Sequence, residues 1–217
     1  MAIDTYNHII NEYIEYLKDV EGVPFQKETD YLISILPNRS KILDVGTAMG
    51  YYPKYLTEKY DKEFEVTGID ASDKMIEQAK KMAPKANFQV MDIRNMKYPD
   101  KSFDCIMCFG TLIHLNDDDC LNALKNFDRI LNDNGILAIN VMEHLSGDRE
   151  IVVEEPFNNN YNMYYNRYPK NFFINFFKEN NYTIIKEFDN PIYNEDSVGD
   201  DLTGTNEFSI IARKNNK

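Results

Sequence analysis

Short apolar runs alternate with amphipathic segments along most of this chain. From residue 41 onward, short apolar runs alternate with stretches in which apolar residues recur at three- and four-residue steps. This alternation is typical of βα units that build a mainly parallel sheet. We therefore predict seven strands, at residues 41–46, 65–70, 87–92, 103–110, 136–143, 183–188 and 207–214. No helical pattern separates the last two, which favours an antiparallel pair.

Helical periodicity also fills the region before the first strand. Apolar residues at helical spacing predict helices across residues 1–36, interrupted at Gly22-Val23-Pro24, and this region is expected to form an N-terminal cap. Four further helices are predicted, at residues 53–60, 72–83, 118–131 and 169–180. The acidic triplet Asp117-Asp118-Asp119 suits the positive end of a helix dipole and is interpreted as a helix start. Residues 1–217 are thus expected to form one domain.

Residues 144–170 break the alternation. This stretch is rich in Asn and Tyr and has no clean period. A long excursion of this kind is typical of a lid or a binding loop, so a lid insertion is predicted here. Genome composition is an equally good explanation for the Asn residues, but less so for the cluster Tyr161, Tyr164, Tyr165 and Tyr168.

Composition narrows the class of partner. A chain of 217 residues suits a single α/β domain, and 43% hydrophobic residues are enough for a packed core. The formal net charge of −12 disfavours binding to nucleic acid or to an anionic membrane and favours a small-molecule partner. The N-terminus lacks a signal-like pattern and no apolar run reaches membrane-spanning length, so a cytoplasmic location is expected. The oligomeric state is not predicted.

The three cysteines favour neither disulfides nor a metal site. Their number is odd, and Cys105 and Cys108 lie three apart within one predicted strand, so their side chains should point to opposite faces of the sheet. They are interpreted as core residues, and no metal site is predicted.

A glycine-bounded turn follows the first strand, between Gly46 and Gly50. Glycines at a strand-to-helix turn allow the backbone to approach a ligand closely. The dinucleotide fingerprint G-x-G-x-x-G is not met, because Ala48 and Tyr51 occupy its second and third glycine positions. A nicotinamide dehydrogenase is therefore disfavoured.

Acidic residues mark three successive strand ends. Asp44 precedes the first glycine by two positions, Asp70 ends the second strand and Asp92 ends the third. A carboxylate at the position of Asp70 can accept hydrogen bonds from both hydroxyls of a ribose, and one at Asp92 can accept from an adenine amino group. Each acid alone is most often a turn residue, so their order along the chain carries the argument.

These segments resemble those of the class I S-adenosylmethionine-dependent methyltransferases, and of their small-molecule branch in particular. Ile42-to-Gly50 resembles the first, glycine-rich motif, and Gly68-to-Ile76 resembles the ribose-binding motif. Residues 98–104 and 108–115 resemble the fourth-strand segment, and residues 127–135 resemble the turn before the fifth strand. The resemblance implies a Rossmann-like, doubly wound α/β fold whose seven-stranded sheet is mostly parallel with an antiparallel last strand.

The resemblance also implies S-adenosylmethionine as cofactor. The backbone at Gly46 and Phe109 would hold the methionine end, Asp70 the ribose, and Asp92 with Ile93 the adenine. The full set of implied cofactor residues is Asp44, Gly46, Thr47, Gly50, Asp70, Ala71, Met75, Asp92, Ile93, Phe109 and Gly110. Ala48 departs from the family, which usually has glycine there, and this departure bears on cofactor affinity.

Methyl transfer from a sulfonium relies mainly on alignment and desolvation, and a base assists when the acceptor must lose a proton. His114, just after the fourth strand, is the first candidate base, followed by Glu143 and His144 at the end of the fifth. Tyr6 and Tyr13 of the predicted cap are candidates for the acceptor pocket. We predict methyl transfer to a small-molecule N or O acceptor. The alternative is a non-catalytic S-adenosylmethionine-binding sensor or accessory protein.

Overall fold

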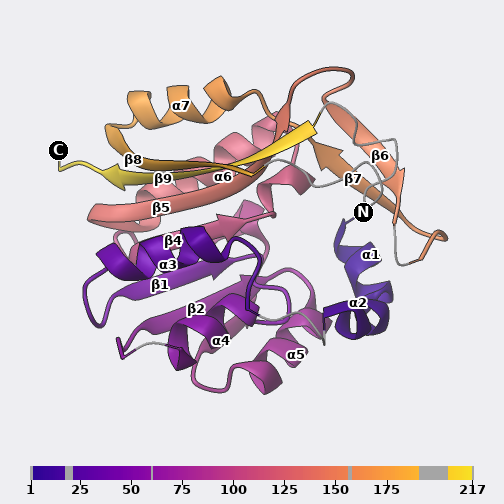
Figure 1. Cartoon of the computed structure of the whole chain (residues 1–217), viewed down its shortest axis with the longest axis horizontal. Coiled ribbons are helices and arrows are strands. Elements are labelled where there is room, and N and C mark those ends of the chain that lie inside the picture. Colours follow the sequence, from indigo (N-terminus) through magenta and orange to yellow (C-terminus); the bar gives the residue numbers. More distant parts are fainter. Residues whose placement is uncertain (1, 18–21, 60, 156–157, 191–204, 217) are drawn as a thin grey trace.

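A seven-stranded sheet forms the centre of the molecule (Figure 1). The computed structural model describes residues 2–17, 22–59, 61–155, 158–190 and 205–216. Three predicted segments therefore include residues that are not described. These are residues 1 and 18–21 of the segment 1–36, residue 60 of 53–60, and residues 156–157 of 144–170. In chain order the strands of this sheet are β1 (Lys41–Val45), β2 (Glu65–Asp70), β3 (Asn87–Val90), β4 (Phe103–Phe109), β5 (Leu131–His144), β8 (Tyr182–Asn190) and β9 (Thr205–Lys214).

The strand order is β3-β2-β1-β4-β5-β9-β8. Strands β1 to β5 pair in parallel, whereas β9 runs antiparallel to both of its neighbours, β5 and β8. The predicted doubly wound sheet with an antiparallel last strand is confirmed. Because the order reverses between β1 and β4, the carboxyl ends of these two strands flank the crevice in which open α/β sheets bind ligands.

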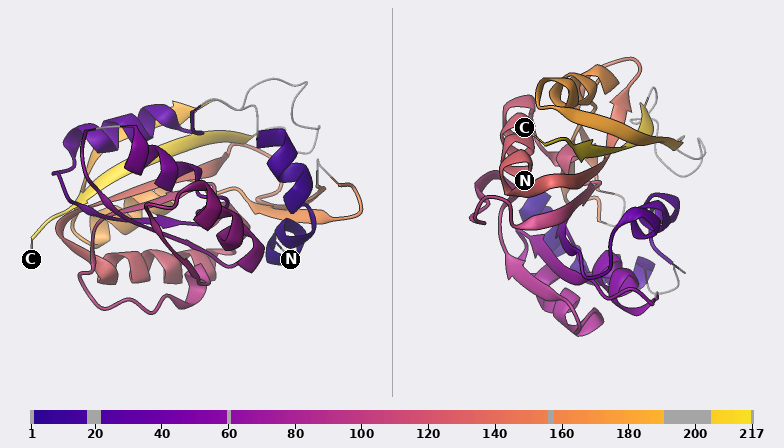
Figure 2. Two further views of the ribbon diagram at one scale, coloured as in Figure 1. Left: turned by 90° about the horizontal axis from the view of Figure 1, so that it is seen from below. Right: turned by 90° about the vertical axis from the view of Figure 1, so that its left-hand side faces the viewer.

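Helices cover both faces of this sheet (Figure 2). Helices α3 (Gln26–Ile35) and α4 (Tyr51–Glu58) pack on one face, and α6 (Asp117–Ile130) and α7 (Lys170–Glu179) pack on the other. Cys105 belongs to the first of these cores and Cys108 to the second, which confirms that their side chains point to opposite faces. Burial raises the pKa of both thiols, as befits core residues.

Helix α6 begins as its sequence predicts. Asn116 is the N-cap, and its side-chain oxygen accepts a hydrogen bond from the Asp119 N–H at 2.8 Å. The acidic triplet fills the first turn, and the buried stripe that follows consists of Cys120, Ala123, Leu124, Phe127 and Ile130. His114 lies in the short connection between the end of β4 at Phe109 and the start of α6 at Asp117, and is therefore close to the carboxyl end of β4.

Residues 144–170 contain regular structure that the sequence did not predict. Strands β6 (Glu150–Glu154) and β7 (Asn162–Asn166) form a separate two-stranded antiparallel sheet, called the hairpin below. Its strands are short, and the apolar residues of β6 are consecutive (Ile151, Val152 and Val153), with Val152 56% exposed, so the sequence of β6 lacks an apolar-polar alternation. Tyr168, expected near a lid, is instead fully buried and its hydroxyl donates to the Leu112 and Leu115 carbonyls.

The N-terminal region forms two short helices, α1 (Ala2–His8) and α2 (Ile10–Leu17), which lie beside the hairpin and away from α3 (Figure 1). Helix α5 (Asp73–Met82) follows β2 and contacts α1. Two single-turn 3₁₀ helices, η1 (Ile93–Asn95) and η2 (Leu112–His114), follow β3 and β4. Within the described part of the chain, none of the helices combines the length and apolarity needed to cross a membrane.

Candidate functional site

A cavity of about 620 Å³ opens at the carboxyl ends of β1, β2, β3 and β4. Helices α1 and α2 and the hairpin complete its walls. The residues predicted for the cofactor that line it are Gly46, Thr47, Asp70, Ala71, Met75, Asp92, Ile93, Phe109 and Gly110. The volume falls within the usual range for small-molecule sites, about 300 to 1,000 Å³.

The turn after β1 is held against β2 by its own backbone. The N–H groups of Gly46 and Thr47 both donate to the Ile69 carbonyl, at 2.8 and 2.9 Å. Gly46 has φ 72°, and a Cβ placed there would lie 1.9 Å from the Thr111 hydroxyl oxygen, so only glycine fits. The N–H groups of Gly46 and Thr47 are therefore engaged with β2.

Asp44 supports the turn from behind the cavity. Its side chain is 2% exposed and accepts a hydrogen bond of 2.6 Å from the Thr47 hydroxyl. Burial raises the pKa of Asp44 to about 7, and the Thr47 hydrogen bond opposes this shift only in part. Gly50, with φ 83°, likewise lies behind the cavity, as the N-cap residue of α4. Asp44 therefore acts on the cavity through the side chain of Thr47, and Gly50 acts through the backbone of the turn.

The carboxylate of Asp70 joins the first and second motifs. One oxygen accepts from the Ala48 N–H at 3.0 Å and the other accepts from the Ser72 N–H at 2.9 Å. Burial raises the pKa of Asp70, and these backbone donors oppose the shift. Each carboxylate oxygen has a second lone-pair direction, so the group is oriented and can still accept hydrogen bonds from a ligand in the cavity.

Asp92 is the N-cap of η1 and is paired with Arg94. It accepts from the Arg94 N–H at 2.9 Å, and the guanidinium Nε lies 2.9 Å from the same oxygen. Hydrogen bonding to Arg94 lowers the pKa of Asp92. A ligand amino group would therefore share this carboxylate with the guanidinium, a partner that the sequence analysis did not consider.

His114 is placed with one ring nitrogen fixed and the other directed at a hydroxyl. Its Nδ1 lies 3.0 Å from the Tyr164 carbonyl oxygen, which can only accept, so Nδ1 carries the proton. Nε2 is then an acceptor, and it lies 3.2 Å from the hydroxyl of Tyr6. Burial lowers the pKa of His114 despite the opposing effect of the Tyr164 carbonyl. The imidazole is therefore held neutral, in the tautomer of a general base.

Aromatic rings surround this pair. The Tyr6 ring meets His114 edge-on, with centroids 5.7 Å apart, and also contacts the ring of Tyr13. The Tyr165 ring lies on the other side of His114, at 5.2 Å. Burial raises the pKa of Tyr6 well above its ordinary value, so its hydroxyl remains protonated and donates to Nε2. No local sequence signal links Tyr6 or the Tyr164 carbonyl to His114.

The other two candidate bases lie outside the cavity lining. Glu143 is at the end of β5, where one of its oxygens accepts a 3.5 Å hydrogen bond from the Asn206 amide. The Nε2 atom of His144 lies 2.9 Å from the Gly147 carbonyl oxygen. The strand therefore carries both side chains to the same rim as His114 but away from the cavity that His114 lines.

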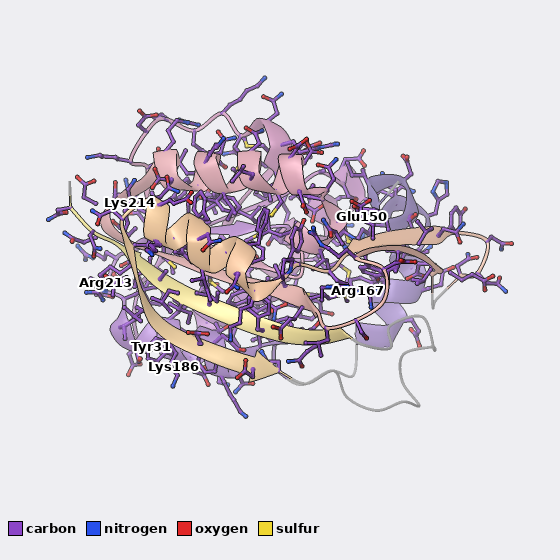
Figure 3. All side chains as sticks on the ribbon, turned by 90° about the horizontal axis from the view of Figure 1, so that it is seen from above. Tyr31, Glu150, Arg167, Lys186, Arg213 and Lys214 are labelled. Carbon is purple, nitrogen blue, oxygen red and sulfur yellow. The ribbon has the colours of Figure 1, made fainter. Side chains whose placement is uncertain are left out.

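Two further carboxylates line the cavity: Asp119, which lies close enough to Arg94 to add to the larger effect of Asp92 in raising the pKa of its guanidinium, and Glu150 of the hairpin. Figure 3 labels Glu150 on the hairpin, at the opposite end of the molecule from Lys214. Among the described residues of the lining, Arg94 is the sole Lys or Arg, and it is paired with Asp92. The described residues contain no group of three or more metal-ligating side chains.

Comparison with known proteins gives a consistent result. A family profile described as a methyltransferase domain matches residues 42–135. The chain is 36% identical over 104 residues to phosphoethanolamine N-methyltransferase 1 of Arabidopsis thaliana, an alignment covering 46% of this chain and 21% of that protein. It is 36% identical over 103 residues to demethylmenaquinone methyltransferase of Thermotoga maritima, covering 47% of this chain and 43% of that protein. The chain thus spans less than half the length of these two relatives.

A solved structure extends the likeness of the fold beyond the matched segment. A crystal structure of a S-adenosylmethionine-dependent methyltransferase from Methanosarcina mazei superimposes with a TM-score of 0.72 at 17% identity, covering 86% of this chain and 98% of that one. The sequence match covers β1 to the start of β5, which carries the cofactor-side wall of the cavity. Residues 42–135 are therefore similar to methyltransferase domains, and the fold of the chain is that of a solved S-adenosylmethionine-dependent methyltransferase.

Proposed function

We propose that this chain transfers the methyl group of S-adenosylmethionine to a nitrogen or oxygen of a small-molecule acceptor, with His114 as general base. The observation that carries the proposal is the placement of His114, whose Nδ1 lies against the Tyr164 carbonyl and whose Nε2 faces the Tyr6 hydroxyl in the same cavity as the cofactor motifs. A protein that only senses the cofactor has no need of a base in that position.

The cofactor residues keep the roles that the family resemblance implies. Asp70 would accept from the ribose hydroxyls, and Asp92 with Ile93 would bind the adenine, against which Met75 would pack. Carbonyl and N–H groups near Gly46, Phe109 and Gly110 would bind the methionine end, with Thr47 and Ala71 lining the cavity between them. Asp44 and Gly50 would act indirectly, by fixing the turn.

The reaction would be an in-line displacement at the methyl carbon. The cofactor supplies an activated methyl group on a positively charged sulfur. The acceptor–carbon bond forms as the carbon–sulfur bond breaks, and the electron pair of that bond goes to sulfur. His114 takes the proton of the acceptor through the Tyr6 hydroxyl, which accepts one proton while donating its own to Nε2. The aromatic rings around His114 exclude water from this step.

Charge in the cavity favours an amine over an acidic acceptor. Glu150 of the hairpin lines the cavity and attracts a cation, and the one arginine of the described lining is neutralised by Asp92. An amine that arrives protonated must lose its proton before it attacks, which is the task that His114 is placed to perform. The two relatives carry names of enzymes that methylate small molecules, which also supports a small acceptor.

The first experiment separates binding from turnover. Isothermal titration of the wild type with S-adenosylmethionine and with its demethylated product should show binding of both. A panel of amines, phenols, carboxylates and phosphorylated amines is then screened for release of demethylated cofactor, with His114→Gln as the matched control.

We expect amines to be the best acceptors and the variant to bind cofactor normally without comparable turnover. Absence of cofactor binding to the wild type would refute the proposal as a whole. Binding without turnover across the panel would favour the sensor or accessory alternative, and a preference for acidic acceptors would refute the amine assignment.

A further inference from the structure

Four consecutive side chains of α1 contact three different parts of the molecule. The Thr5 hydroxyl donates to the Asn162 carbonyl at 3.1 Å, and His8 stacks on Tyr161 with ring centroids 4.8 Å apart, so both residues touch the hairpin. Tyr6, between them, reaches His114 after β4. Asn7 points to the start of α5. Helix α1 therefore contacts both the hairpin and α5, and Figure 1 shows it between these two elements.

The contact of Asn7 is with the ribose-binding motif itself. The Ser72 hydroxyl donates to the Asn7 side-chain oxygen at 2.5 Å and accepts from the Met75 N–H at 3.0 Å. Ser72 is 1% exposed, and its own N–H donates to Asp70. Lys74 adds a second link, because its Nζ donates to the Asn7 carbonyl at 2.8 Å. A continuous chain of hydrogen bonds thus joins the Asp70 carboxylate to α1.

We propose that Asn7 is a positioning residue that couples binding of the cofactor at Asp70 to docking of α1 over the acceptor side of the cavity. The inference rests on the proposed function, since it takes Asp70 as the ribose-binding group. A ribose bound by Asp70 fixes the turn from Asp70 to Ser72. This turn orients the Ser72 hydroxyl, which donates a hydrogen bond to the Asn7 side-chain oxygen. Docking of Asn7 brings its neighbour Tyr6 to His114. Linkage requires the converse as well, so a docked α1 strengthens cofactor binding.

The fold does not need Asn7 for its own integrity. Ser72 caps α5 through its bond to Met75 N–H, which is independent of α1. Helices α1 and α2 share a small apolar core with the cofactor side of the cavity. This core centres on Ile10, Met49 and Met75 and does not include Asn7. Loss of the Asn7 side chain should therefore weaken coupling and leave the sheet intact.

The test compares Asn7→Ala with His8→Ala, a variant of the next residue that removes a contact with the hairpin. Titration with demethylated cofactor measures affinity, and hydrogen exchange of residues 2–17 with and without that ligand measures docking. Steady-state kinetics give kcat and KM. Asn7→Asp, which keeps an oxygen acceptor for the Ser72 hydroxyl, serves as the conservative rescue.

We expect Asn7→Ala to weaken cofactor binding about five- to tenfold, within the usual range of coupling between sites, and to abolish the ligand-induced protection of residues 2–17. Its kcat should fall while the melting temperature of the protein stays within about 2 °C, because one partly exposed hydrogen bond is lost. His8→Ala should keep wild-type cofactor affinity, and Asn7→Asp should restore protection.

The outcomes distinguish this inference from the function on which it rests. If the wild type binds the cofactor and Asn7→Ala retains both its affinity and its protection, the coupling is refuted while the function stands. If His8→Ala lowers affinity as much as Asn7→Ala, Asn7 has no special role. If the wild type binds no cofactor, both the function and the coupling fail.

Discussion

The two walls of the cavity are built in different ways. The cofactor wall consists of turns that directly continue β1, β2, β3 and β4, and hydrogen bonds from Gly46 and Thr47 to Ile69 fix the first turn against its neighbouring strand. The acceptor wall consists of α1, α2 and the hairpin, joined by single side-chain contacts between residues 108 positions apart, as in Tyr6–His114, or 157 apart, as in Thr5–Asn162.

This difference has an energetic consequence. Backbone pairs in a sheet open together with the core, whereas a short helix held by a few side-chain bonds opens at much lower cost. We infer that the cofactor wall is preorganised and that the acceptor wall assembles by docking. Variants in the two walls should then separate into those that lose cofactor binding and those that lose only turnover.

The largest effect is expected for His114→Gln. Gln cannot act as a base, so kcat should fall by about 10² to 10⁴, the usual contribution of a general base. Affinity for the demethylated cofactor, measured by titration, should stay within about threefold, because small changes of contact cost less than 1 kcal/mol. A Gln variant with nearly normal turnover would show that His114 only packs, and the comparison of the two walls would lose its main support.

Asp70→Ala should show the opposite behaviour. It removes the acceptor of the Ala48 and Ser72 N–H groups and of the ribose hydroxyls, so cofactor affinity should fall about 100-fold, as expected for loss of two charge-assisted hydrogen bonds. Titration measures this loss. Asp73→Ala, an exposed acid in the first turn of α5, is the matched control and should bind normally. Equal binding by both variants would contradict the assignment of Asp70.

The pH dependence of kcat/KM tests the electrostatics of the acceptor wall. Burial lowers the pKa of His114, so the imidazole stays neutral and active until the pH falls below its ordinary value of about 6.5. Below the lowered pKa the rate should drop about tenfold per pH unit as the base becomes protonated. Residual activity of His114→Gln should lack this acid limb. A wild-type limb centred above pH 7 would contradict a desolvated His114.

Ala48→Gly should have the smallest effect. Ala48 has φ 45°, a left-handed conformation that costs a side-chain-bearing residue about 1 kcal/mol or more, whereas glycine adopts it freely. The greater entropy of glycine in the unfolded chain offsets part of this gain. The free energy of unfolding, measured with urea, should rise by about 0.5 kcal/mol, and cofactor affinity should change less than threefold. A clear loss of stability would mean that the Ala48 methyl group makes packing contacts of its own.

Local signals in the sequence were sufficient for the sheet and for most of the cofactor wall. Strand runs, glycines at the turn after β1 and acids at Asp70 and Asp92 are local signals, and parallel strands bring their carboxyl ends to one edge whatever the rest of the chain does. The hairpin escaped prediction because its strands are short and the apolar residues of β6 are consecutive in the sequence instead of alternating with polar ones. The pairing of Asp92 with Arg94 is local as well, but a charged neighbour two residues away does not reveal whether the two groups meet.

Only the tertiary structure decided which base faces the cavity. His114, Glu143 and His144 all follow the ends of neighbouring strands, yet the cavity is lined by His114 alone among these three. What sets His114 apart is the carbonyl of Tyr164 and the hydroxyl of Tyr6, which lie 50 and 108 residues away in the sequence. The same holds for Asn7 and Ser72, 65 residues apart. Such contacts depend on how α1 and the hairpin pack against the finished sheet, and packing between distant segments leaves no periodic trace in the sequence.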